Sequence, residues 1–232
     1  MHRFPTRPPR PQRLLIFARV PETGLVKTRL ARELGDERTL EIYSSMLADL
    51  LTTIGPSDEE IEVEVMWTGS DAVQGRQLSE HFRGASVAMQ TGSNLGERLA
   101  IAFAERLFFH GTEKVIAIGV DDPSFTRREA ERAFQLLDSC EWVVGPATDG
   151  GYYLVGCRAS AFRSDVFEEI GWGTASVLAQ TTAKIRAAGK TLALLPEHRD
   201  IDELGDLKTF AASIPEHARR IRQTIENWGW HA

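Results

Sequence analysis

Short apolar runs alternate with longer amphipathic segments along most of this chain, and no other feature constrains its fold as strongly. Residues 14–18 form an apolar run of strand length, and residues 61–67 place apolar side chains at every second position. Between them, apolar residues recur at helical spacing over 40–54, with Asp36 as a candidate N-cap. This alternation predicts a largely parallel sheet with helices on both faces, because parallel strands need long crossover connections.

The same alternation continues along the rest of the chain. We predict helices over residues 71–82, 94–109, 126–137, 175–188, 203–212 and 215–228, and strands over 114–119, 142–145, 152–156 and 191–195. Asn94 is the expected N-cap of the helix that it begins, and Thr126 with Glu129 forms a capping box. The expected architecture is an α/β fold of three layers, αβα, with a mostly parallel mixed sheet.

Length and composition fit one domain of this kind. The chain has 232 residues, and a hydrophobic share of 42% suffices for one buried core. Residues 14–232 are the expected domain, whereas residues 1–13, rich in proline and arginine, are an expected flexible tail. The sequence contains neither a signal-peptide core nor a run of about 18 apolar residues, so we expect a cytoplasmic protein without a membrane span.

Charge and the metal-ligating side chains exclude several classes of function. A formal net charge of -6 gives no general attraction to polyanions, so nucleic acid is not an expected partner and phosphate must bind in a local pocket. Cys140 and Cys157 lack neighbouring ligands at metal spacing and are expected to be reduced core residues. The 6 histidines form no ligand pair, and we expect them at the surface. No motif supports a serine or cysteine nucleophile.

A loop with glycine and two cations follows the first predicted strand. Residues 21–29 (PETGLVKTR) place Gly24, Lys27 and Arg29 between a strand and a helix, where free backbone N–H groups can bind phosphate. This loop is not a Walker A motif, because Val26 stands where that motif has a glycine before its lysine. The spacing leaves two interpretations, a phosphate cradle and an ordinary surface turn with solvated cations.

Acidic residues follow two other predicted strands. In residues 119–123 (GVDDP), a strand delivers Asp121 and Asp122 to the edge of the sheet, where carboxylate oxygens suit Mg²⁺ or Mn²⁺. Asp202, within residues 200–206 (DIDELGD), can approach the same metal or cap the next helix. Turn formation and helix capping are the competing interpretations of these two segments.

A glycine-rich segment lies between two further predicted strands. In residues 146–153 (PATDGGYY), Gly150 and Gly151 allow close approach of the backbone, and Asp149 and Tyr152 are placed to contact a ligand. The alternative is a plain hairpin turn, since Asp-Gly is a strong turn signal.

Taken together, these segments resemble a bacterial family of uncharacterised GT-A-like glycosyltransferases in the nucleotide-diphospho-sugar transferase superfamily, some of which are linked to arsenosugar biosynthesis. The resemblance covers about residues 14–210 in order. Its motifs are FARVP (17–21), GLVKTRL (24–30), LGER (95–98), GVDDP (119–123), DGGYY (149–153) and DID (200–202). The chain departs from the family pattern at Asn94, Val120 and Glu203, and none of these is a proposed metal carboxylate.

The resemblance implies a single-domain GT-A fold that uses Mg²⁺ or Mn²⁺. Asp121 matches the aspartate of the family's G-[ST]-D-x-P motif and Asp202 its second acidic motif, so these two are the implied metal ligands. Lys27 and Arg29 match basic positions of related nucleotidyltransferases and are implied catalytic residues, with Asp149 as the candidate acceptor-side base. The residues expected to bind the nucleotide are Ala18, Arg19, Gly24, Lys27, Arg29, Arg98, Asp121, Gly150, Gly151 and Tyr152.

Three functions are compatible with these residues. The first, which we expect, is metal-dependent transfer of a sugar from a nucleoside diphosphate sugar to a small-molecule acceptor. The second is nucleotidyl transfer, in which an NTP reacts with a phosphorylated small molecule and pyrophosphate is released. The third is non-catalytic binding of a nucleotide sugar, because a fold does not dictate its function.

Overall fold

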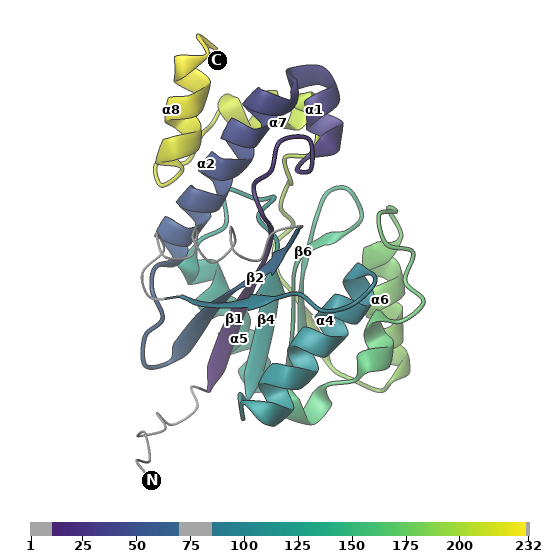
Figure 1. Ribbon diagram of the computed structural model, residues 1–232. Coiled ribbons are helices and arrows are strands. Elements are labelled where there is room, and N and C mark those ends of the chain that lie inside the picture. Colours follow the sequence, from purple (N-terminus) through teal and green to yellow (C-terminus); the bar gives the residue numbers. More distant parts are fainter. Residues whose placement is uncertain (1–10, 70–84, 231–232) are drawn as a thin grey trace.

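A seven-stranded sheet has the strand order β3-β2-β1-β4-β6-β5-β7. Figure 1 labels its central strands β2, β1, β4 and β6. The computed structural model describes residues 11–69 and 85–230. The strands are β1 (Gln12–Arg19), β2 (Ile61–Thr68), β3 (Ser86–Met89), β4 (Lys114–Ile118), β5 (Trp142–Pro146), β6 (Tyr152–Arg158) and β7 (Leu192–Leu194). All neighbouring strands pair in parallel except β6, which runs antiparallel to both β4 and β5. The predicted mostly parallel mixed sheet is therefore confirmed.

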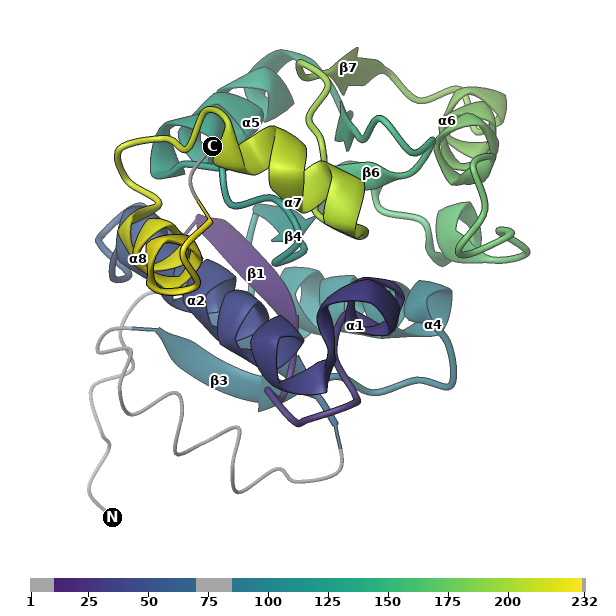
Figure 2. The same ribbon diagram turned by 90° about the horizontal axis from the view of Figure 1, so that it is seen from above.

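Helices cover both faces of this sheet. They are α1 (Thr28–Leu34), α2 (Asp36–Ile54), α4 (Leu95–Ala104), α5 (Arg127–Ser139), α6 (Val177–Ala187), α7 (Leu204–Ala211) and α8 (Arg219–Asn227). A π-helical turn, Glu105–Phe109, continues α4, and two 3-10 turns, Ala159–Ala161 and Ser164–Phe167, precede α6. Figures 1 and 2 show α2 and α8 side by side, away from α4 and α6.

Successive residues of β1 supply the two halves of the core. Leu14 and Ile16 belong to a buried cluster that includes residues of α2, α5, α7 and α8, whereas Leu15 belongs to a second cluster with α4 and α6. Side chains of a strand alternate between the faces of its sheet, so an unbroken apolar run is suited to a strand that is covered on both sides. The single-domain, three-layer αβα architecture predicted from the sequence is confirmed.

Two of the predicted helix starts, at Asn94 and at Thr126, are confirmed. Oδ1 of Asn94 accepts a hydrogen bond from the backbone N–H of Glu97 at 3.0 Å, as an N-cap does. Thr126 and Glu129 form the predicted capping box of α5. At α2 the prediction was wrong, because Asp36 is the first helical residue and Gly35 is the N-cap.

Other boundaries differ from the predicted ones. β1 begins at Gln12, inside the segment expected to be a tail, because Arg13 is buried and its guanidinium binds Glu62 at 2.8 Å and Glu64 at 2.9 Å. The sequence patterns indicated neither α1 nor β3. The predicted helix over residues 71–82 lies outside the described residues.

The last helix begins later than expected, at Arg219 rather than at residue 215. The buried carboxylate of Asp49, on α2, accepts hydrogen bonds from the backbone N–H groups of Arg220 at 2.8 Å and Ile221 at 3.0 Å. A carboxylate from a neighbouring helix thus satisfies the first amide groups of α8, which have no partner within their own helix.

Cys157 is buried, Cys140 is half-buried, and both are free thiols. Within residues 11–69 and 85–230, no helix combines the length and the apolar character needed to cross a membrane.

Candidate functional site

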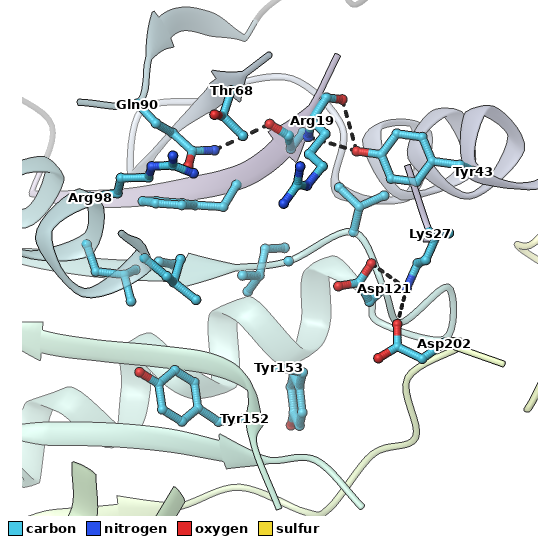
Figure 3. Close-up of a pocket in the computed structure, with 18 of the residues that line it drawn as sticks. Arg19, Lys27, Tyr43, Thr68, Gln90, Arg98, Asp121, Tyr152, Tyr153 and Asp202 are labelled. Atoms are coloured by element: carbon cyan, nitrogen blue, oxygen red, sulfur yellow. Dashed lines mark hydrogen bonds and ion pairs between the residues drawn. The ribbon is translucent and has the colours of Figure 1, made fainter. Parts of the chain in front are cut away.

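A cavity of about 650 Å³ opens where β1, β2 and β4 end and β6 begins (Figure 3). Parallel strands bring their carboxyl ends to one edge of a sheet, and ligands of open α/β sheets bind at that edge. The residues that line the cavity include Phe17, Ala18, Arg19, Leu25, Lys27, Arg29, Tyr43, Thr68, Gln90, Leu95, Arg98, Asp121, Tyr152, Tyr153 and Asp202.

Most of the residues predicted from the sequence surround this cavity. Ala18, Arg19, Lys27, Arg29, Arg98, Asp121, Tyr152 and Asp202 all contribute to its lining. The other predicted residues, Gly24, Asp149, Gly150 and Gly151, are not part of the lining. The structure therefore brings the basic loop and the two acidic motifs together around the cavity, whereas Asp149, Gly150 and Gly151 of the glycine-rich turn lie outside its lining.

A lysine lies between the two predicted metal aspartates. Nζ of Lys27 is 2.6 Å from Oδ1 of Asp121 and 2.7 Å from Oδ1 of Asp202 (Figure 3). Only 5% of the lysine side chain is exposed. Burial disfavours its ammonium, but the two carboxylates outweigh this effect, so the pKa of Lys27 is above its ordinary value. The group is therefore a buried cation held by two anions.

The backbone holds the three side chains of this cluster in place. Lys27 has a φ of 45°, a left-handed conformation that is unfavourable for a residue other than glycine and is kept only where its surroundings require it. The N–H of Ile201 donates a hydrogen bond to the carbonyl oxygen of Asp121 at 2.9 Å, which places the next residue, Asp202, beside that loop. Segments remote in sequence thus meet at Lys27.

Three arginines supply further positive charge. Nη1 of Arg29 lies 3.9 Å from Oδ2 of Asp202, and its side chain is exposed. Figure 3 shows the guanidinium of Arg19 directed into the cavity, between Arg98 and Lys27 in that view. No carboxylate of the described chain is ion-paired with Arg19 or Arg98. These two guanidinium groups are thus suited to bind the oxygens of a phosphate group.

Two further polar side chains of the cavity, Gln90 and Tyr43, were not among the predicted site residues. The amide Nε2 of Gln90 donates to the carbonyl oxygens of Met66 at 2.8 Å and Ala18 at 3.3 Å. The hydroxyl of Tyr43 donates a hydrogen bond to the carbonyl oxygen of Arg19 at 2.9 Å and accepts one from the backbone N–H of Arg19 at 2.8 Å. These bonds fix the backbone at the end of β1. No motif marks either residue, since each acts through a strand distant in sequence.

His198 is not at the surface, and the prediction was wrong for this residue. Its Nδ1 lies 2.6 Å from Oδ2 of Asp122 and its Nε2 lies 2.9 Å from Oε1 of Glu129. The hydrogen bonds to Asp122 and Glu129 raise the pKa of His198 to about 10. The ring is half-buried because the carboxylates of Asp122 and Glu129 lie against it. Both residues are distant from His198 in the sequence, so the sequence alone does not indicate this contact.

Asp200 is a second residue missing from the predicted set, although it opens the DID motif. Its Oδ1 is buried and forms no hydrogen bond with any described residue. Burial, followed by the charge of Asp121, raises the pKa of Asp200 to about 7. It lines a small cavity of about 40 Å³ that adjoins Asp121, Asp122 and Tyr153.

The glycine-rich turn has the features of the hairpin interpretation. Gly150 has a φ of 88°, and a Cβ at this position would lie 2.2 Å from the carbonyl oxygen of Ala175. The N–H of Gly151 donates to Oδ1 of Asp149 at 2.8 Å, so this carboxylate stabilises its own turn. Asp149 is exposed.

Asp121 and Asp202 could supply two ligands of a divalent cation only if a substrate supplied further oxygens. Within the described part of the chain, no group of three His, Cys, Asp or Glu side chains is placed to hold a metal. Mg²⁺ is commonly bound by one or two carboxylates together with substrate phosphates and water. The two carboxylates are therefore a partial ligand set that a diphosphate would complete, provided that Lys27 moves away from them.

Comparison with known proteins places the fold among nucleotide-dependent transferases. The structure is similar to that of a candidate nucleotide-diphospho-sugar transferase from Desulfovibrio desulfuricans G20, with 29% sequence identity and a TM-score of 0.82 over 94% of this chain and 98% of that one. A cytidylyltransferase from Leptospira borgpetersenii shares the fold at 15% identity and a TM-score of 0.57, over 95% of each chain. The inositol-1-phosphate CTP transferase from T. maritima does so at 12% identity and a TM-score of 0.55, over 94% of this chain and 97% of that one.

The sequence itself matches a bacterial family. No protein with a curated description matches it. A family model matches residues 54–174, which include β2, β4, β5 and the acidic loop at Asp121. The chain therefore belongs to the family described as uncharacterized protein conserved in bacteria (DUF2064).

Proposed function

We propose that this protein transfers a sugar from a nucleoside diphosphate sugar to a small-molecule acceptor, with the donor bound in the cavity at the ends of β1 and β4. The observation that carries the proposal is the convergence of Lys27, Asp121 and Asp202, with the guanidinium groups of Arg19 and Arg98 in the same cavity. A departing diphosphate carries negative charge, and preorganised cations stabilise such charge in the transition state.

The side chains divide this work between binding and positioning. Lys27 and the guanidinium groups of Arg19, Arg29 and Arg98 bind the diphosphate oxygens. Asp121 and Asp202 are the residues that would hold Mg²⁺ or Mn²⁺. When bound, the cation supplies positive charge that neutralises the leaving diphosphate. The nucleoside lies toward Gln90, where the polar side chains fix the end of β1.

The acceptor approaches from the side of β6. In the reaction, the bond between sugar and diphosphate breaks, an acceptor atom forms the new bond to the sugar, and the acceptor proton passes to a base. Asp149 is the proposed base, and this role requires the reacting carbon of the sugar and the attacking acceptor atom to lie beyond the cavity lining, beside the turn that carries Asp149, because Asp149 does not line the cavity. The arsenosugar connection implied by the resemblance stays a prediction.

Nucleotidyl transfer is the second candidate function, favoured by the fold that the chain shares with cytidylyltransferases. In that reaction a phosphate acceptor attacks the α-phosphate of an NTP, and the same cations stabilise the departing pyrophosphate. The products distinguish the two reactions: sugar transfer releases a nucleoside diphosphate and nucleotidyl transfer releases pyrophosphate. A binding protein without catalysis releases neither.

Thermal unfolding against a panel of nucleoside diphosphates, nucleotide sugars and NTPs, with and without Mn²⁺, tests the proposal. A ligand at about 100 times its Kd adds roughly 2.7 kcal/mol to the free energy of unfolding. We expect stabilisation by one nucleotide class that Asp121→Asn reduces. Asp138→Asn is the matched control and leaves the stabilisation unchanged, because this exposed aspartate pairs with Lys114 at the opposite end of β4 from the cavity.

The products follow from ³¹P NMR of the protein with the stabilising ligand and a mixture of small acceptors. Release of a nucleoside diphosphate supports sugar transfer, and pyrophosphate supports the second candidate. Absence of stabilisation by every nucleotide contradicts the assignment of the cavity.

A further inference from the structure

The segment that carries Asp202 is tied to its neighbours by backbone hydrogen bonds. At its start, the N–H of His198 donates to the carbonyl of Pro146 at 3.0 Å and the carbonyl of His198 accepts from the N–H of Thr148 at 2.9 Å, which attaches the segment to the end of β5 and to the turn after it. Near its end, the N–H of Ile201 donates to the carbonyl of Asp121 at 2.9 Å. The segment thus bridges β5 and the loop after β4 immediately before it reaches the cavity.

The side chain of His198 adds a further attachment, which is charged. Both ring nitrogens face carboxylate oxygens, of Asp122 at 2.6 Å and of Glu129 at 2.9 Å. An imidazole nitrogen donates a hydrogen bond only when it carries a proton, so two carboxylate partners require the imidazolium form. The side chain is 15% exposed and that of Asp122 is 5% exposed, so water screens this pair only weakly.

The partners of the ring are themselves fixed. Glu129 lies in the first turn of α5, and its Oε2 accepts a hydrogen bond from the backbone N–H of Thr126 at 2.6 Å. The ring of Tyr153 stacks on the imidazole with centroids 4.3 Å apart and planes inclined by 15°. Asp122 follows Asp121 directly and accepts a hydrogen bond from the N–H of Ser124 at 2.8 Å. The imidazolium is therefore held by α5, by β6 and by the loop after β4.

We propose that His198 is a positioning residue for the cavity: it fixes the segment that carries Asp202 against the loop that carries Asp121, and so sets the separation of the two carboxylates that hold Lys27. His198 does not line the cavity and touches no proposed substrate group. The functional meaning of this positioning rests on the proposed function of the cavity. The claim that His198 fixes the segment of Asp202 does not depend on that function, so an experiment can contradict either claim without the other.

The test measures the burial of Lys27, without any nucleotide. Each protein is treated with an acetylating reagent, and the rate at Lys27 is followed by mass spectrometry relative to the exposed Lys208. In the wild type, Lys27 is protected by its burial between two carboxylates. In His198→Gln we expect its relative rate to rise about tenfold, which corresponds to about 1.4 kcal/mol of lost local stability.

His217→Gln is the matched control. His217 contacts the same loop, since its Nε2 lies 3.1 Å from the carbonyl of Pro123, but among the described residues it forms no ion pair and it is not on the segment of Asp202. We expect wild-type protection of Lys27 in this variant. Equal reactivity of Lys27 in the wild type and in His198→Gln overturns the proposal, and so does an equal rise in both histidine variants.

A third variant distinguishes a local effect of His198 on Lys27 from general unfolding of the protein. In His198→Arg, the guanidinium keeps the charge, can donate to both carboxylates and stacks on an aromatic ring, so protection of Lys27 is expected to return at least in part. If His198→Gln does not fold, His198→Asn is measured in its place, and protection of Lys27 equal to that of the wild type in this folded variant contradicts the positioning role. The same variants are then titrated with UDP, CDP and GDP plus Mn²⁺. Weaker binding by His198→Gln than by His217→Gln extends the role to ligand binding, whereas equal binding confines His198 to the geometry of the free protein and overturns its functional part.

Discussion

Nζ of Lys27 lies 2.7 Å from Oδ1 of Asp202, a residue 175 positions away in the sequence. The contact makes two functions of the cavity depend on each other, because the cation proposed to meet a phosphate and the carboxylate proposed to meet a metal neutralise one another. Neither charge is available to a ligand until the other is compensated. A nucleotide bound together with its metal compensates both at once.

From this contact we predict that Lys27→Met binds Mn²⁺ more tightly than the wild type when no nucleotide is present. The ammonium no longer competes for the two carboxylates, and an affinity gain of about tenfold is expected, equivalent to about 1.4 kcal/mol. Electron paramagnetic resonance of free Mn²⁺ measures this affinity. Arg29→Met removes an exposed charge of the same sign near Asp202 and should change it less. Unchanged or weaker Mn²⁺ binding in Lys27→Met would show that the lysine does not compete with the metal.

Arg98→Gln is predicted to weaken binding of the nucleoside diphosphate while leaving the fold intact. A hydrogen bond to a charged group contributes about 1.5–3 kcal/mol, so the Kd should rise roughly 10- to 100-fold. Calorimetric titration measures the change. Arg128→Gln, an exposed arginine on α5, is the control of equal charge. If both variants bind alike, the guanidinium of Arg98 is not a phosphate ligand.

The stability of the protein should depend on pH through His198. Its pKa is raised from 6.5 to about 10, so its ion pairs stabilise the folded protein fully below pH 6.5 and this contribution is lost as the pH rises toward 10. The difference in unfolding free energy between the wild type and His198→Gln should therefore be largest near pH 6 and shrink steadily toward pH 10. Urea denaturation at several pH values measures it. A difference that does not vary with pH would mean that the histidine is neutral.

Gly150→Ala is predicted to destabilise the protein more than Gly173→Ala. Both glycines have a positive φ, 88° and 80°, so both substitutions introduce backbone strain of about 1–2 kcal/mol. At Gly150 the added Cβ also meets the carbonyl of Ala175 at 2.2 Å, whereas at Gly173 it meets nothing within 4 Å. Thermal denaturation of the two variants isolates the steric part. If Gly150→Ala keeps its stability and instead loses nucleotide binding, the residue contacts the ligand.

The sequence predicted the fold wherever an element buries a regular face. β1 and β2 were found because apolar residues fill them or alternate along them, and α5 because its capping box marks its start. β3 has four residues, of which none is fully buried, so it lacks the apolar pattern that identifies a strand. α1 is a short helix with Leu30 as its only buried residue, and it offers no repeat to detect.

The residues of the candidate site likewise fall into those that a local sequence pattern identified and those that it did not. Lys27, Asp121 and Asp202 were predicted because each lies in a compact motif next to a predicted strand or helix. His198 and Gln90 were missed because each depends on partners that only the folded sheet brings near: two carboxylates for the histidine, and two backbone carbonyls for the amide. A polar residue of this kind has no local signature, since its role is defined by the side chains and strands around it.

The reversed direction of β6 couples two walls of the cavity. Its first residues, Tyr152 and Tyr153, form one wall, and the turn over residues 147–151 joins that wall to β5 instead of a crossover helix. The N–H of Thr148, in this turn, donates at 2.9 Å to the carbonyl oxygen of His198, on the segment that carries Asp202. A displacement of the turn is therefore expected to move the tyrosine wall and the cluster around Lys27 together.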